Sequence, residues 1–292
     1  MRVLITGGNG QVGYCLTEQL KKLDNVEVLS LDVDGLDITD ESAVHLVVEE
    51  FKPTIIINAA AHTAVDRAES EIELSYAINQ HGSKYLAQAA DKIDAAILHI
   101  STDYVFSGDK EGHYAEIDPT EPQSVYGESK LAGEQEVINA CDKHIILRTA
   151  WVFGEVGNNF IKTMLRLGKE RDALSIVGDQ YGGPTHAGDI ANALISIATK
   201  IKNNEPVEYG LYHFSGFPHV SWFEFAEAIF DKAKAHGIIE KVPALTSITT
   251  ADYPTPAKRP GNSKLATDKI TSNFNIEASD WQVALENIKQ YA

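Results

Sequence analysis

A tyrosine and a lysine stand four positions apart in the segment Tyr126-Gly-Glu-Ser-Lys130, within a stretch of helical spacing. Side chains at that separation lie on one face of a helix. A positive charge beside a phenol stabilises the phenolate and lowers the phenol pKa from about 10 toward neutral pH. Tyr126 can then act as a general acid for an oxygen that gains negative charge. Taken alone, Tyr-x-x-x-Lys is a common pattern that usually marks only a solvated helix face.

The position of this pair favours the catalytic interpretation. It begins the helix that follows the fourth strand–helix unit, and that fourth strand ends in Ser-Thr-Asp-Tyr-Val-Phe at residues 101–106. Ligands of open α/β sheets bind outside the carboxyl ends of the strands. There, Thr102 can donate a hydrogen bond to the same substrate oxygen. We therefore expect Thr102, Tyr126 and Lys130 to act together on a carbonyl that receives hydride.

A glycine-rich segment, Thr-Gly-Gly-Asn-Gly-Gln-Val-Gly, occupies residues 6–13 between a strand-like run and a helical stretch. Gly8, Gly10 and Gly13 have the spacing Gly-x-Gly-x-x-Gly, and Gly7, Gly10 and Gly13 have the spacing Gly-x-x-Gly-x-x-Gly. Both permit a tight turn and the approach of backbone N–H groups to a pyrophosphate at a helix N-terminus. A purely structural turn is the alternative. Because the turn lies between a strand and a helix, with Asp32 19 residues after Gly13, the pattern favours a dinucleotide site.

Acidic residues after the second strand bear on the choice of cofactor. Asp32 can accept hydrogen bonds from the adenosine ribose, and with Asp34 it should repel a 2′-phosphate, which favours NADH over NADPH. A nearby basic residue can offset that repulsion, so both cofactors stay open. Asp37 is placed to flank the adenine, or it only caps the end of the strand.

Strands and helices alternate along the first half of the chain. Expected strands are residues 3–5, 26–31, 54–57, 95–100 and 144–147, and expected helices are 12–23, 40–51, 71–90 and 124–141. Apolar β-branched runs alternating with amphipathic stretches at this pitch are typical of βαβ units. We therefore expect an α/β fold with a doubly wound, mainly parallel, Rossmann-type sheet.

The pattern loosens after Trp151. We expect helices at 158–169, 189–200, 221–235 and 279–290 and strands at 173–177 and 210–214. This predicts an NAD(P)-binding domain over 1–151 and a smaller α/β substrate lobe over 152–292, with a soft boundary because a late segment can return to the first sheet. The proline-rich segment 251–263 is a surface loop, or it presents Lys258 and Arg259 to the substrate.

Composition excludes several classes of protein. The net charge of −17 argues against nucleic acid or an anionic membrane as a partner. Two cysteines, Cys15 and Cys141, cannot form a disulfide framework and have no metal-ligand spacing. No apolar run approaches the length of a membrane span, and the first strand-like run is too short for a signal peptide. We expect a cytoplasmic enzyme without a metal.

Together these motifs resemble the extended short-chain dehydrogenase/reductases, and more closely the family of dTDP-4-dehydrorhamnose reductases. The segments that carry the resemblance cover nearly the whole chain: 10–13, 58–66, 101–106, 126–134, 148–153, 157–160, 179–182 and 253–263. The resemblance implies hydride transfer from NADH or NADPH to C4 of a dTDP-linked 4-keto-6-deoxy sugar, giving dTDP-L-rhamnose for surface polysaccharide. A reductase of another nucleotide-linked keto-sugar and a non-catalytic cofactor-binding subunit are the alternatives.

The resemblance also implies roles for individual residues. The cofactor phosphates would meet Gly7, Gly10, Gln11, Val12 and Gly13. The ribose and adenine would meet Asp32, Asp37 and Ile38, and the nicotinamide side would be lined by Ala61, His62 and Thr63, with Lys130 on its ribose. Catalysis would fall to Thr102, Tyr126 and Lys130. The sugar nucleotide would contact Thr102, Asp103, Trp151 and Arg259. Asn79 matches a position that often supports a proton relay.

Several of these residues have a structural alternative. His62 can equally cap a loop, Trp151 can belong to the core, and Arg148 can be part of a structural ion pair. Arg259 can bind a diphosphate bidentately or anchor its own loop.

The chain departs from the resembled family at one feature. Some members form dimers bridged by magnesium on carboxylates, and the matching positions here are Cys15 and Gly188. Neither offers the hard oxygen ligand that magnesium prefers. Asp189 restores one ligand only under a shifted alignment. We expect a monomer, or a dimer that needs no metal.

Overall fold

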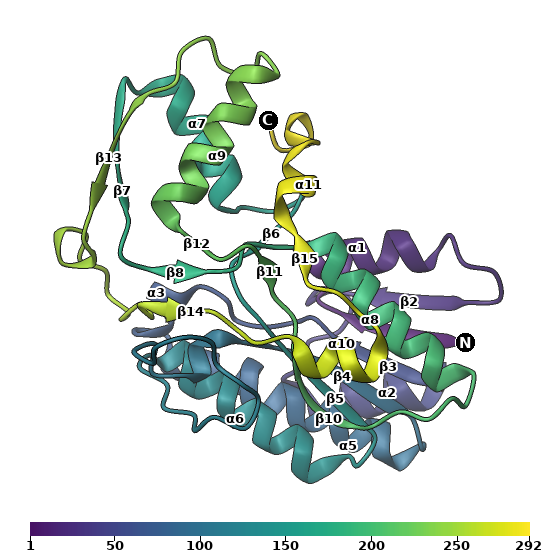
Figure 1. Cartoon of the computed structure of the whole chain (residues 1–292). Helices are drawn as coiled ribbons and strands as arrows, with labels where there is room; N and C mark the ends of the chain where they lie inside the picture. The colour runs from purple at the N-terminus through teal and green to yellow at the C-terminus, as the bar shows by residue number, and fades with distance from the viewer.

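The computed structural model describes all 292 residues, and a six-stranded parallel sheet forms its centre (Figure 1). The strands, in their order across the sheet, are β10 (Gly210–His213), β5 (His144–Thr149), β4 (Ala96–Thr102), β3 (Ile55–Asn58), β1 (Arg2–Thr6) and β2 (Glu27–Leu31). The chain runs from β1 to β2 and then crosses to the other side of β1 for β3. The strand order therefore reverses between β1 and β3, where the fold class predicts a ligand site.

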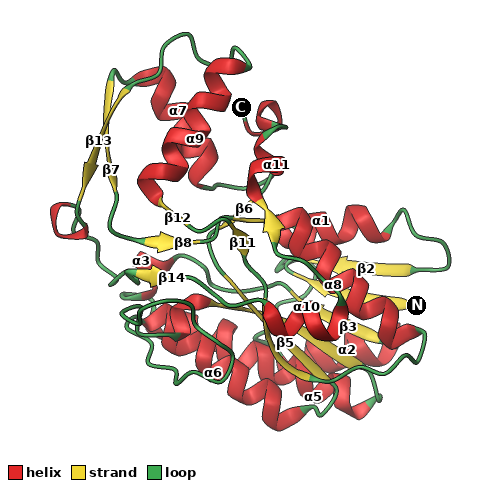
Figure 2. Cartoon of the chain, in the orientation of Figure 1, coloured by secondary structure: helices red, strands yellow, loops and turns green.

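Side chains that alternate along each strand bury both faces of the sheet. Val3 and Ile5 belong to one apolar cluster and Leu4 to another, and β3 and β5 repeat this alternation. On the first face lie α1 (Gln11–Leu20), α8 (Ala187–Lys202) and α10 (Asp268–Phe274). On the second lie α2 (Glu41–Phe51), α5 (Ser83–Lys92) and α6 (Val125–Ala140), as Figure 2 shows. The predicted doubly wound fold is confirmed.

The segment between β3 and β4 differs from the single helix expected over 71–90. It contains α3 (Val65–Ala68), α4 (Ile72–Tyr76), a wider π-helical turn η1 (Ala77–Gly82), and then α5. A Cβ on Gly133 of α6 would lie 2.1 Å from the Asn79 carbonyl oxygen, which also accepts a hydrogen bond of 2.8 Å from the Ser83 hydroxyl. The π turn thus coincides with a close approach of its backbone to α6. Periodicity alone does not reveal such a turn, because the apolar face continues through it.

A second apolar core lies beyond the carboxyl ends of the sheet strands. Its helices are α7 (Phe160–Glu170), α9 (Trp222–Ala235), α11 (Trp281–Leu285) and the short η4 (Ile288–Tyr291), and the strand pair is β7 (Ala173–Val177) with β13 (Ala244–Ile248). Ser221 starts α9 with a capping box that it shares with Glu224. The strand β13 and the helix α10 were not expected from sequence, and the expected helix 279–290 is instead β15 (Ser279–Asp280), α11 and η4.

Very short elements connect the two cores. They are η2 (Asp103–Val105), β6 (Val152–Phe153), β8 (Tyr181–Gly182), β9 (Thr185–His186), β11 (Gly216–Phe217), β12 (Val220–Ser221), η3 (Thr250–Asp252) and β14 (Asn262–Ser263). From the second half of the sequence, α8, β10 and α10 return to pack on the first sheet, whereas the C-terminus lies beside α11 (Figure 1). None of the helices combines the length and the apolar character that crossing a membrane requires.

Candidate active site

The start of α6 brings the expected catalytic tyrosine to the end of β4. The Ser124 side chain caps the helix by accepting a hydrogen bond of 3.2 Å from the Gly127 N–H. A Cβ at position 127 would lie 2.2 Å from the Tyr104 carbonyl oxygen, so only glycine lets α6 come this close. Tyr126 is consequently buried, with the Thr102 side chain near enough to affect its pKa. The structure therefore brings together two of the three expected catalytic residues.

Lys130 lies one turn further along α6 and does not act on the phenol as expected. Its Nζ donates a hydrogen bond of 2.7 Å to the Ile100 carbonyl oxygen of β4. Burial lowers the pKa of Lys130 to about 8. Burial also raises the pKa of Tyr126, and the nearby Thr102 side chain opposes this only in part. The expected lowering of the Tyr126 pKa is thus reversed, because desolvation outweighs any field from a lysine that points to the backbone. Tyr126 is held in the protonated form that a general acid requires.

Asp103 joins the second core to this site. Its two carboxylate oxygens accept hydrogen bonds from the Thr102 hydroxyl, at 3.1 Å, and from the hydroxyl of Ser263 in β14. Burial raises the pKa of Asp103 to about 6, although both hydroxyls act in the opposite direction. Ser263 was not among the expected site residues, although it ends the segment 253–263 that carries the family resemblance, and it meets Asp103 across 160 positions of sequence.

Trp151 is held on the carboxyl-end side of β5 in a strained conformation. Its φ angle is +49°, which side chains with a Cβ rarely adopt. Trp222 at the start of α9 stacks on it with ring centroids 3.5 Å apart, and a Cβ on Gly182 would lie 2.6 Å from the indole. The Trp151 ring is only partly buried. Its surroundings fix the indole in one place and leave part of it open to a ligand.

Arg259 makes the contacts of a loop anchor. One guanidinium nitrogen donates a hydrogen bond of 2.6 Å to Asp66, which follows β3, and another donates one of 3.3 Å to the Tyr104 hydroxyl. The Tyr104 ring in turn meets Tyr126 edge to face at 5.4 Å. The guanidinium is therefore separated from Tyr126 by the Tyr104 ring, and its observed partners belong to the chain itself.

The glycine loop has the shape that a dinucleotide pyrophosphate requires. Gly7 has a φ angle of +71°, and a Cβ on Gly13 would lie 2.1 Å from the Gly7 carbonyl oxygen. No side chain caps the start of α1, so its first N–H groups face outward at the positive end of the helix dipole. Asp32 accepts a hydrogen bond of 2.9 Å from the Asn9 N–H at the tip of the loop. The cradle and the ribose-binding acid expected from sequence are thus adjacent.

Of the other residues expected to bind the cofactor, some lie at the surface and some lie in the core. The Gln11 side chain accepts a hydrogen bond of 3.0 Å from Asn159, the cap of α7, and so links the loop to the second core. Asp37 accepts hydrogen bonds from the N–H and hydroxyl of Thr39, which is the capping arrangement weighed above. Ile38 is buried against the position of Gly82. Val12 is partly buried at the start of α1.

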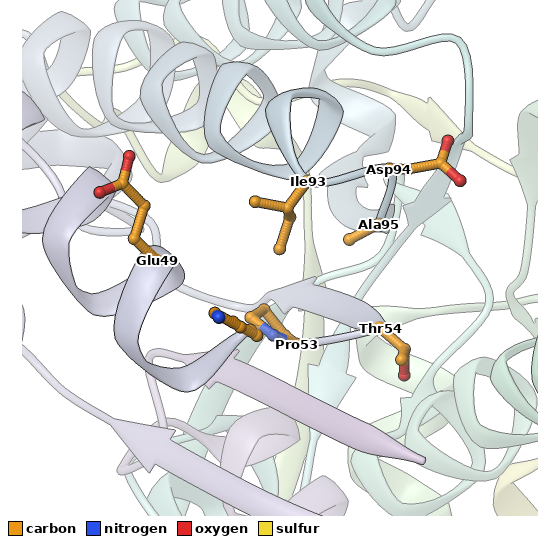
Figure 3. A pocket seen from close by; sticks show the side chains of 7 residues that line it. Glu49, Pro53, Thr54, Ile93, Asp94 and Ala95 are labelled. Atoms are coloured by element: carbon orange, nitrogen blue, oxygen red, sulfur yellow. The ribbon is translucent and has the colours of Figure 1, made fainter.

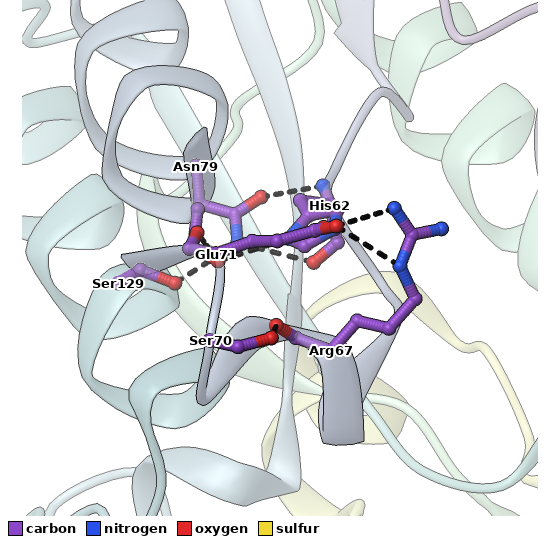
Figure 4. A network of polar contacts seen from close by, with 7 residues as sticks. His62, Arg67, Ser70, Glu71, Asn79 and Ser129 are labelled. Carbon is purple, nitrogen blue, oxygen red and sulfur yellow. Dashed lines mark hydrogen bonds and ion pairs between the residues drawn. The ribbon is translucent and has the colours of Figure 1, made fainter. Parts of the chain in front are cut away.

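A polar network connects the loop after β3 to α6 (Figure 4). The His62 N–H donates a hydrogen bond of 2.8 Å to Asn79, and the Asn79 amide donates one of 2.9 Å to Ser129, which lies between Tyr126 and Lys130 on α6. The His62 ring faces Glu71 at 3.1 Å. The contacts of His62 are thus compatible with both interpretations, a residue that caps its loop and a residue on the nicotinamide side, because the loop that it fixes is joined to α6. Ala61 and Thr63 flank His62 in this loop.

A buried ion pair that the sequence only hinted at holds α6 against β5. Arg148 donates two hydrogen bonds, of 2.8 and 2.6 Å, to the Glu134 carboxylate, which also accepts one from Ser101. The structural alternative for Arg148 is therefore the observed one. Alternation along β5 places Arg148 on the α6 side, but only the fold shows its partner.

The positions considered for magnesium do not assemble a metal site. Cys15 is buried, and burial raises the pKa of its thiol to about 12. Asp189 lies beside His186, whose other ring nitrogen contacts Glu155 at 3.0 Å. No group of three or more histidine, cysteine or acidic side chains has an arrangement that fits a metal ion.

One cavity lies away from these residues. Its volume is about 570 Å³, and Figure 3 shows it near the amino ends of the strands, lined by Glu49, Lys52, Pro53, Thr54, Ile93, Asp94 and Ala95. Its two acids pair with Lys92 and Lys143. None of the residues expected to bind cofactor or substrate lines this cavity.

Comparisons with known proteins agree over the whole chain. Residues 1–292 match the family described as RmlD substrate binding domain. The dTDP-4-dehydrorhamnose reductase of Aggregatibacter actinomycetemcomitans is 55% identical over 291 residues, covering 100% of this chain and 99% of the relative. The enzyme of that name from Escherichia coli K12 is 43% identical, covering 99% and 97%.

Solved structures are similar in the same way. A dTDP-4-dehydrorhamnose reductase from Clostridium acetobutylicum has a TM-score of 0.90 at 42% identity and covers 99% of this chain and 98% of that one. The enzyme from Bacillus anthracis, solved in complex with NADP, has a TM-score of 0.89 at 39% identity and covers 100% and 99%. A Thermus thermophilus UDP-glucose 4-epimerase, at 20% identity and a TM-score of 0.80 over 100% of this chain and 99% of that one, shares the fold.

Proposed function

Because the chain belongs to the family of dTDP-4-dehydrorhamnose reductases, we propose that it reduces the C4 keto group of dTDP-4-dehydro-L-rhamnose with NADH or NADPH. The product is dTDP-L-rhamnose, a precursor of surface polysaccharide. One observation supports the proposal most: Thr102 and Tyr126 are buried close together at the carboxyl end of β4, with Lys130 one turn further along the helix of Tyr126.

The chain has the residues to hold a nicotinamide dinucleotide. The close packing of Gly13 on Gly7 and the uncapped start of α1 support a pyrophosphate there, with Gly10, Gln11 and Val12 around it. Asp32 would hold the adenosine ribose, and Asp37 and Ile38 would border the adenine. Ala61, His62 and Thr63 would line the nicotinamide side. When bound, the cofactor supplies the hydride.

Each catalytic side chain has a distinct task. Tyr126 gives its phenol proton to the C4 oxygen. The Thr102 hydroxyl, which donates to Asp103 in the structure, turns to donate a hydrogen bond that positions that oxygen. With a pKa lowered by burial to about 8, Lys130 is mostly charged at pH 7, so it favours the phenolate once Tyr126 has lost its proton and can also bind the nicotinamide ribose. Burial of all three residues excludes water, which strengthens each of these interactions.

The sugar nucleotide would lie between the sheet and the second core. Asp103, joined to Ser263, can accept hydrogen bonds from sugar hydroxyls, and Trp151 offers an indole face fixed by Trp222. Arg259 can retain Asp66 and still present a positive charge to the diphosphate. We therefore place the sugar nucleotide at the junction between residues 1–151 and the lobe of residues 152–292. Two unpaired, buried cysteines support a reducing compartment, the cytoplasm.

Incubation with dTDP-4-keto-6-deoxy-L-hexose and either reduced cofactor tests the activity through loss of reduced nicotinamide. Tyr126→Phe should lower turnover by roughly two orders of magnitude or more, because the ring packing stays while the proton donor is lost. Binding of the cofactor should hardly change. Tyr85→Phe on α5 serves as the matched control and should behave as wild type.

The same experiment separates the alternatives. Near-normal turnover in Tyr126→Phe would contradict the assigned mechanism. Turnover of a different nucleotide-linked keto-sugar in place of the dTDP sugar would identify a related reductase. Cofactor binding without turnover of any keto-sugar would identify a non-catalytic subunit.

A further inference from the structure

A row of buried polar side chains crosses the sheet next to the catalytic lysine. Thr6 of β1, Asn58 of β3 and His99 of β4 are cross-strand neighbours in register. Their exposed fractions are 1%, 0% and 0%. Buried polar groups cost stability unless they are hydrogen-bonded, and apolar residues would fill the same space in a parallel sheet. The mechanism above does not use this row, so its presence requires another reason.

Hydrogen bonds fix the orientation of the middle member. The Ala60 N–H, which can only donate, points to Asn58 Oδ1 at 3.2 Å, and the Thr6 hydroxyl donates to the same oxygen at 2.8 Å. The other end of the amide is therefore Nδ2, a donor, and it lies 3.1 Å from His99 Nδ1. His99 Nδ1 must accept this hydrogen bond and so carries no proton.

The second ring nitrogen of His99 then carries the proton. Complete burial lowers the pKa of His99 well below its ordinary value, and the Lys130 charge acts in the same direction, so the ring is neutral. With Nδ1 unprotonated, a neutral ring has its hydrogen on Nε2. That nitrogen lies 3.5 Å from Lys130 Nζ. An ammonium has no lone pair to accept an N–H, whereas a neutral amine does.

We propose that His99 is a positioning residue for Lys130, because its Nε2–H disfavours the ammonium on one side and leaves the Ile100 carbonyl as the lysine's acceptor. This inference rests on the proposed reductase function. The titratable groups that face Lys130 are His99 from β4 and Glu134 from α6, which favours the charged lysine. Arg148 from β5 already holds Glu134 in two hydrogen bonds. Burial is the main cause of the lowered Lys130 pKa, and His99, anchored by Asn58, is the neighbouring side chain whose N–H adds to it.

The pH dependence of kcat/KM reports the charge of Lys130. Activity requires a charged Lys130, so kcat/KM falls as the pH rises through the pKa of this lysine in the free enzyme, which burial lowers to about 8. A side chain at position 99 that lacks a donor should let Lys130 keep its proton to higher pH. A side chain that accepts a hydrogen bond from Asn58 and donates one toward Lys130 should leave the pH at which kcat/KM falls unchanged.

Two substitutions measure this. His99→Phe fills the space without a donor, and the alkaline limb of kcat/KM should move up by about one pH unit, which retains about tenfold more relative activity at high pH. His99→Gln presents an acceptor and a donor, and its limb should match that of wild type. His213→Gln, which alters another buried histidine two strands away on β10, is the matched control and should leave the limb in place. An unmoved limb in an active His99→Phe enzyme would overturn the proposal.

Nitrogen NMR of the wild-type chain decides the case even if His99→Phe fails to fold. Long-range proton–nitrogen correlations, assigned by the signals that His99→Gln lacks, should show His99 neutral with its proton on Nε2. A proton on Nδ1 or a charged ring would overturn the inference. This readout needs no substrate, so failure of the proposed reductase activity would be recognised separately.

Discussion

Three ionisable side chains of the site owe their altered proton affinity to the same cause. Burial raises the pKa of Tyr126, raises that of Asp103 to about 6 and lowers that of Lys130 to about 8. Desolvation disfavours the charged form of each, whatever its sign. Near pH 7 the tyrosine is still protonated and the lysine still charged. A buried site thus keeps one proton donor and one cation ready, although neither group contacts the other.

At the scale of single residues, Lys130→Met separates a catalytic lysine from a structural one. Methionine fills a similar volume, and removing a charge that is costly to bury offsets the lost bond to Ile100. We expect turnover to fall by about 10- to 100-fold and cofactor affinity to weaken, with an unfolding temperature equal to or above that of wild type. Steady-state kinetics and thermal melts measure this, with Lys92→Met on the surface as control. Unaltered kinetics would remove Lys130 from the mechanism.

Asp32→Ser tests the cofactor loop at the same scale. The carboxylate lies at the tip of the loop, and its negative charge should repel the 2′-phosphate of NADPH. Its removal should raise the ratio of kcat/KM with NADPH to kcat/KM with NADH by about tenfold. Asp34→Ser, which changes an exposed acid two positions on, should change the ratio much less. If the ratio is the same in Asp32→Ser and wild type, Asp32 does not face the ribose.

At the scale of elements, contacts between α6 and its neighbours place the proposed catalytic residues. Gly127 and Gly133 let α6 approach Tyr104 and the π turn η1, and the pair of Glu134 with Arg148 fixes it to β5. Each contact joins α6 to a different segment, so the helix is held along its length. Mispositioning by about 1 Å is enough to impair catalysis, which explains why so many buried contacts converge on one helix.

A second junction between elements predicts a pH-dependent stability. His186 precedes α8 and contacts Glu155, which follows β6, and Asp189. Burial lowers the pKa of His186, but the neighbouring carboxylates of Asp189 and Glu155 outweigh it and raise the pKa to about 9. Because the folded pKa exceeds the unfolded value of 6.5, the stabilisation is fully present below pH 6.5 and is lost as the pH rises through 9.

Denaturant unfolding of wild type and His186→Gln at several pH values measures this contribution. The free energy of unfolding should fall between pH 6.5 and 9 in wild type by up to about 3 kcal/mol more than in the variant. His81→Gln, at an exposed position of η1, should parallel wild type. Parallel curves for His186→Gln and wild type would show that the carboxylates do not hold the histidine.

At the scale of the whole molecule, a surface of net charge −17 encloses a site for an anionic substrate. Long-range attraction does not assist binding, so backbone N–H groups at the start of α1 and individual cations such as Arg259 must provide it locally. The two cores meet at these groups. Binding should therefore be sensitive to the contact between Gln11 and Asn159, which joins them.

Assembly of the whole chain is expected not to depend on magnesium. Cys15 and Gly188 offer no oxygen ligand, and His186 engages both Glu155 and Asp189. We expect a chain that is monomeric, or dimeric through a surface that needs no metal, and active without added magnesium. Light scattering on a sizing column with magnesium, and then with a chelator, measures this alongside turnover. A dimer that forms only with the metal would mean that other carboxylates bind it.

The sequence by itself determined the features that depend on neighbours in the chain. Periodicity located the first five sheet strands and most helices, because burial of one face leaves a regular pattern over many residues. The glycine loop, Asp32, Thr102 and the pair of Tyr126 with Lys130 were recognisable because each lies at a fixed place relative to a strand end.

Only the tertiary structure decided what those residues touch. The two-residue strands are too short to leave a pattern, and Arg259 meets Asp66 across 193 positions of sequence. Lys130 binds the backbone of β4 and not the phenol, and burial sets the direction of the Tyr126 pKa. Desolvation and hydrogen bonding depend on every segment packed around a group, and no local spacing of residues contains that information.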